Sequence, residues 1–198
     1  MAEGLKTREV KAEDRKAGEE KHADVEEGLT HAYDVKGDAF GTIMKTVADG
    51  VVRAARGTGK AGISVPEAVT CVVRHAMQGS LDGSDLVTRA KAIVMGVIRG
   101  TGEKEDVALK TLSHAAHSII HQTAGMTGDI AAAATGVVLG AIASAAHMGV
   151  APLRAAAAAR GAVIEEAERL VPAEAVRVRR ALVKDVGEYN VVFPPPIM

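Results

Sequence analysis

The sequence predicts an all-α fold of about seven helices, arranged as repeated helical hairpins in a bundle or a short α-solenoid. Three observations lead to this prediction. Alanine accounts for 37 of the 198 residues and aromatic residues for only 2%, so the core must be built from small side chains. Breaks with the chemistry of helix ends recur at helix-length intervals, and one four-residue pattern recurs between them.

The breaks define the expected elements in order. Ser64, Pro66 and Glu67 form a helix start, with a capping hydroxyl, a first-turn proline and an acid three residues after the cap. Glycines such as Gly57 and Gly100 are expected to end helices, because a terminating residue often adopts a positive φ. The expected helices span 39–57, 65–79, 84–100, 103–125, 128–149, 152–170 and 173–187.

The recurring pattern is a small residue, two β-branched or other apolar residues and usually a long polar residue. Its successive copies are 18 to 26 residues apart, which is the length of one helix with its turn. Pairs of copies therefore match the length of helical-hairpin repeats that stack on one another. The copies begin at Gly50, Cys71, Gly96, Ser118, Gly136, Ala162 and Ala181.

Small residues also recur four apart within helices, where they let a neighbouring backbone approach closely. A glycine inside a helix costs about 1 kcal/mol relative to alanine, so repeated glycines predict a compensating helix contact. The sequence leaves open whether that neighbour belongs to the same chain or to another copy. The residues assigned to such contacts, and through them to self-association, are Gly50, Gly96, Gly100, Gly136, Gly140 and Ser144.

Composition divides the chain into an arm at 1–38, a helical repeat domain at 39–188 and a tail at 189–198. The arm carries 7 basic and 11 acidic residues, and its low apolar content predicts a solvated, flexible segment. The tail is apolar and proline-rich, which favours an extended conformation. It is expected to bind a neighbouring subunit or another protein, or to fold back onto the last helix, and its named contact residues are Phe193, Pro194, Pro195 and Pro196.

One segment has the length of a membrane span. Residues 130–153 contain no acidic residue and no basic residue other than His147. A helix of this length is long enough to cross a bilayer. The segment is rich in alanine, glycine, serine and threonine, which insert weakly. We therefore expect a central core helix, with contact to lipid as the alternative.

Candidate chemistry is sparse. His114, His117 and His121 lie along one face of an expected helix, where imidazoles can bind a metal ion. Three ligands on one straight helix seldom converge, so a polar face is the preferred interpretation and no metal or other cofactor is predicted. Cys71 occupies the small-residue position of the pattern and is expected to be a buried thiol.

These observations predict a non-enzymatic helical scaffold or adaptor that forms homo-oligomers and binds partners through its tail. The first alternative is a peripheral membrane or lipid-binding protein, and the second is a metal-binding protein that uses the three histidines. A formal net charge of −1 argues against nucleic acid as a partner. No secretory signal pattern precedes the helices, so a cytoplasmic location, with possible membrane association, is the expectation.

Overall fold

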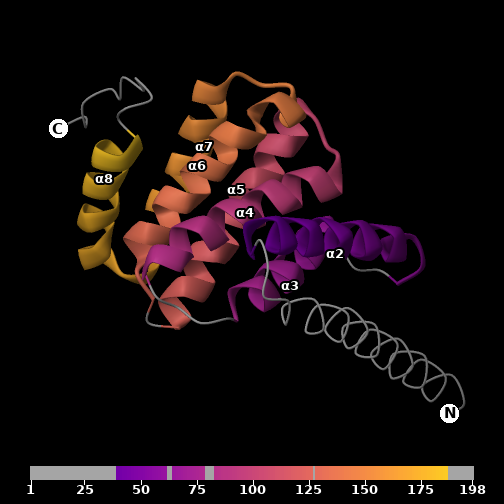
Figure 1. Ribbon diagram of the computed structural model, residues 1–198, viewed down its shortest axis with the longest axis horizontal. Helices are drawn as coiled ribbons and strands as arrows, with labels where there is room; N and C mark the ends of the chain where they lie inside the picture. Colours follow the sequence, from indigo (N-terminus) through magenta and orange to yellow (C-terminus); the bar gives the residue numbers. More distant parts are fainter. Residues whose placement is uncertain (1–38, 62–63, 79–82, 127, 187–198) are drawn as a thin grey trace, which may run out of the picture.

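The protein folds into α-helices, as the sequence predicts (Figure 1). The computed structural model describes residues 39–61, 64–78, 83–126 and 128–186, and these ranges contain seven helices and no strand. The predicted arm at 1–38 and tail at 189–198 lie outside the described residues. The helices are α2 (Ala39–Ala61), α3 (Val65–Met77), α4 (Gly83–Thr101), α5 (Glu105–Gly125), α6 (Ile130–Met148), α7 (Pro152–Leu170) and α8 (Pro172–Val186).

The helices form two layers. We call α2, α4, α6 and α8 the even layer, because each of them packs on the next in that order. We call α3, α5 and α7 the odd layer, in which α5 packs between α3 and α7. Each odd helix also packs on the even helices that precede and follow it in the chain, and α8 lies at one edge of the molecule (Figure 1). This arrangement is a stack of helical hairpins.

The recurring sequence pattern places one copy in each of the seven helices. The second residue of every copy is buried, with at most 1% of its surface exposed. The fourth residue is exposed in every helix except α6, where Leu139 is half-buried. The pattern thus fixes the inward face of each helix, and the buried second residues are Val51, Val72, Val97, Ile119, Val137, Val163 and Leu182.

Several helix ends have the predicted chemistry. Ser64 caps α3 in a reciprocal capping box with Glu67, and the Asp129 side chain accepts hydrogen bonds from the first turn of α6. Gly149 ends α6 with a φ of 72°, a left-handed conformation that glycine adopts without steric cost.

One predicted helix end is wrong, and another differs from the structure by one residue. Helix α2 continues past Gly57 to Ala61, because an interior glycine weakens a helix without necessarily ending it. Gly100 lies inside α4, and the residue with positive φ after that helix is Gly102, at 63°. Gly100 instead serves a close contact between helices, described below.

Helix α6 is one of the two inner helices of the even layer. It packs on α4, α5, α7 and α8, which explains why so apolar a sequence folds within the domain. In the part of the chain that the structure describes, it is the one helix long and apolar enough to cross a membrane, and 67% of its apolar stretch is buried by the fold. Its surroundings are those of a core helix.

Candidate functional site

The glycines of α4 pack directly on α2. A methyl group added at Gly96 would lie 2.6 Å from the carbonyl oxygen of Met44, and one added at Gly100 would lie 2.7 Å from that of Ala48. The advance of four residues on both helices shows that α4 and α2 run parallel. Any side chain larger than hydrogen at these positions would push the two backbones apart.

The glycines of α6 repeat this contact on α4. A methyl group at Gly136 would overlap the carbonyl oxygen of Val87, and one at Gly140 would lie 2.9 Å from that of Lys91. Gly50 and Ser144, the other small residues assigned to contacts, are also buried. The four glycines whose neighbours are known therefore pack against helices of the same chain, and these contacts are not contacts between copies.

The three histidines of α5 lie between the odd-layer helices, and they do not face a common point. His114 is directed toward α3, where its Nε2 donates a hydrogen bond to the carbonyl oxygen of Pro66 at 2.9 Å. The same nitrogen lies 2.9 Å from Oγ1 of Thr70, which is 3.4 Å from Oγ of Ser118. This group joins α3 to α5 by polar contacts.

His117 and His121 are directed toward α7 instead. Nε2 of His117 is buried, has no hydrogen-bond partner among the described residues and lies 3.7 Å from a carboxylate oxygen of Glu165. Nδ1 of His121 lies 3.4 Å from Oε1 of Glu166 and 3.5 Å from Nη2 of Arg169. The histidine face is therefore divided between the two neighbouring helices.

Glu166 is the electrostatic centre of the contact between α5 and α7. Its side chain is only 8% exposed, and its carboxylate accepts hydrogen bonds from Nε of Arg169 at 2.9 Å and from Nη2 of the same residue. These hydrogen bonds lower the pKa of Glu166 despite the opposing effect of burial, and the Arg169 charge, His121 and His117 contribute in the same direction. The Arg169 pKa is raised by the same pair. Glu166 is thus held in its charged form.

Within the described ranges, no three His, Cys, Asp or Glu side chains gather in a group that would hold a metal ion. The reason is visible in the histidine contacts, because His114 is bound to α3 while His121 is opposed by the acid–base pair of α7. Cys71 is buried in α3, as its place in the recurring pattern predicts. The polar-face interpretation of the histidines agrees with this geometry.

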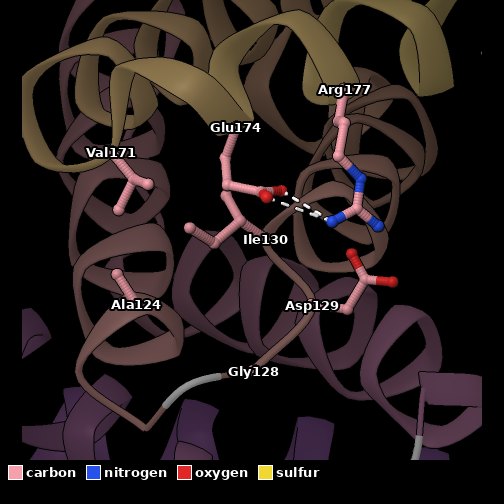
Figure 2. A pocket seen from close by; sticks show the side chains of 7 residues that line it. All are labelled: Ala124, Gly128, Asp129, Ile130, Val171, Glu174 and Arg177. Carbon is pink, nitrogen blue, oxygen red and sulfur yellow. Dashed lines mark hydrogen bonds and ion pairs between the residues drawn. The ribbon is translucent and has the colours of Figure 1, made fainter.

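A pocket of about 390 Å³ opens between α8 and the connection from α5 to α6 (Figure 2). Figure 2 shows the Glu174 carboxylate paired with Arg177, and both carboxylate oxygens accept hydrogen bonds from Nη1 of Arg177, at 3.1 and 3.0 Å. The Asp129 carboxylate lies near that guanidinium in the same view. The walls of the pocket are Ala124, Gly128, Asp129, Ile130, Val171, Glu174 and Arg177.

The polar groups of this pocket already have structural partners. Oδ1 of Asp129 accepts hydrogen bonds from the backbone nitrogens of Ala131 and Ala132, so it caps α6. Glu174 is engaged by Arg177. The arrangement stabilises the junction of α6 and α8, and it offers a ligand little that is not already bonded.

The sequence analysis did not identify the role of Glu166 and Arg169. A signal for their placement exists in the numbering. Contacts between neighbouring odd helices join residues about 48 apart, as in the pairs Pro66–His114, Asp106–Arg154 and His121–Arg169. Adding this step to His117 and His121 leads to Glu165 and Arg169 of α7.

The tail residues Phe193, Pro194, Pro195 and Pro196 lie outside the described residues, so the structure does not place them. Comparison of the chain with protein-family models, with curated proteins and with solved structures finds no match.

Proposed function

We propose that this chain is a helical-repeat scaffold or adaptor without enzymatic activity, which self-associates and carries protein partners on its surface. The observation that supports the proposal best is that the same kinds of contact repeat along the stack. Glycine contacts repeat from α2–α4 to α4–α6, and polar contacts about 48 residues apart repeat from α3–α5 to α5–α7. Stacks of this kind present extended surfaces suited to binding other proteins.

The outward surface of α2 and α4 has the charge expected of a docking face. Lys45 and Arg56 are exposed on α2, and Lys91 and Arg99 lie eight residues apart on α4, on the same side of that helix. Lys91 lies beside α2, because its ammonium is 5.6 Å from the centre of the Phe40 ring. We call Lys45, Arg56, Lys91 and Arg99 the basic face.

The basic face matches an acidic protein segment. Asp49 is the one acidic residue whose side chain the structure describes on α2 and α4, and none of the four cations forms an ion pair with another described residue. The arm at 1–38, with 11 acids and 7 bases, supplies complementary charge. We infer that the arm of one copy binds the basic face of another. Because the glycines are buried inside each chain, contacts between copies would be made by the outer surfaces of the helices.

The engagement of the polar side chains supports a structural role over catalysis. His114 is bonded to a backbone carbonyl, and Glu166 is bonded to Arg169. A general acid or base needs a group free to exchange a proton with a substrate. The candidates described above are instead used to join helices.

Light scattering of the full chain during size-exclusion chromatography tests the proposal. We expect an oligomer at low salt whose mass falls toward that of a monomer as salt is raised, because screening weakens exposed charge pairs. The double variant Lys45→Glu/Arg99→Glu should dissociate at low salt. Lys110→Glu, an exposed change on α5 in the odd layer, is the matched control and should leave the mass unchanged. A monomer under every condition would contradict self-association.

A further inference from the structure

We draw no further inference here: the strongest candidate, the surface patch that Leu139, Ile142, Ala143 and Ala146 of α6 form beside Lys91 of α4, is an apolar helix face, and nothing in the described part of the structure shows what covers it.

Discussion

The even and odd layers differ in the contacts that hold neighbouring helices together. Helices α2, α4 and α6 of the even layer meet through glycine against backbone, as at Gly96 on Met44 and Gly136 on Val87. Neighbouring odd helices meet through polar groups, as at His114 on Pro66 and His121 on Glu166. In the even layer, the close contact between backbones leaves no space for an added methyl group. In the odd layer, the contacts are made by long side chains that can change conformation. We therefore expect the even layer to set stability and the odd layer to make it depend on pH.

The strongest test of this difference is a single methyl group in the even layer. Gly136→Ala places that group against the Val87 carbonyl and 2.8 Å from Cβ of Ala90, so the helices must separate. We expect the free energy of unfolding to fall by about 2–3 kcal/mol, although alanine is the better helix former. Urea unfolding followed by circular dichroism measures the loss. An unchanged midpoint would show that α4 and α6 are not in close contact.

The next largest effect is expected at the charged contact of the odd layer. Glu166→Gln removes the charge that Arg169 and the two histidines face. We expect a loss of about 1–2 kcal/mol at neutral pH, smaller than a fully buried charged hydrogen bond would give because the Arg169 side chain is 60% exposed.

The same variant tests the dependence on pH. Because the pKa of Glu166 is lowered in the folded state, its contribution is complete above the ordinary glutamate pKa of about 4.3 and is lost as the pH falls through the lower folded value. The free energy of unfolding, measured from pH 7 to pH 2, should therefore fall less in Glu166→Gln than in the wild type. Parallel curves would exclude Glu166 as a source of the acid dependence.

A smaller effect is expected between α3 and α5. His114→Ala removes the hydrogen bond to Pro66, whose carbonyl oxygen still accepts one from Thr70 at 3.0 Å. The expected loss is about 1 kcal/mol. His114→Gln, which retains a donor, should recover part of it. If the glutamine variant is as unstable as the alanine variant, then packing rather than the hydrogen bond explains the effect.

The smallest effect has the opposite sign. Gly161 on α7 is exposed, and no atom of the described residues lies within 4 Å of a methyl group added there. Gly161→Ala should therefore raise the free energy of unfolding by about 1 kcal/mol through helix propensity. A loss of stability at this position would mean that another segment contacts that side of α7.

The sequence predicted most of the fold for identifiable reasons. Ser64 and Asp129 cap helices through local hydrogen bonds, which depend on residues only a few positions away. The buried second residue of the recurring pattern likewise follows from helical periodicity, as at Val97 and Val163. Local chemistry was sufficient for these features.

The remaining features depend on contacts between distant segments. The residues around Gly100 do not show whether this glycine ends its helix or packs against a neighbouring helix. Only the position of α2 distinguishes these two roles. The partners of His117 and His121 lie 45 to 48 residues away on α7. Their identity required the register of the stack, which the sequence pattern alone did not determine.

The glycines of α4 and α6 pack against the backbones of neighbouring helices within a single chain. This packing is tested most directly by measuring the urea midpoints of the wild type and Gly136→Ala over about a hundredfold range of protein concentration. The account predicts the same loss of stability in the variant at every concentration. A loss that disappears on dilution would show that Gly136 packs against another copy, and would contradict the account.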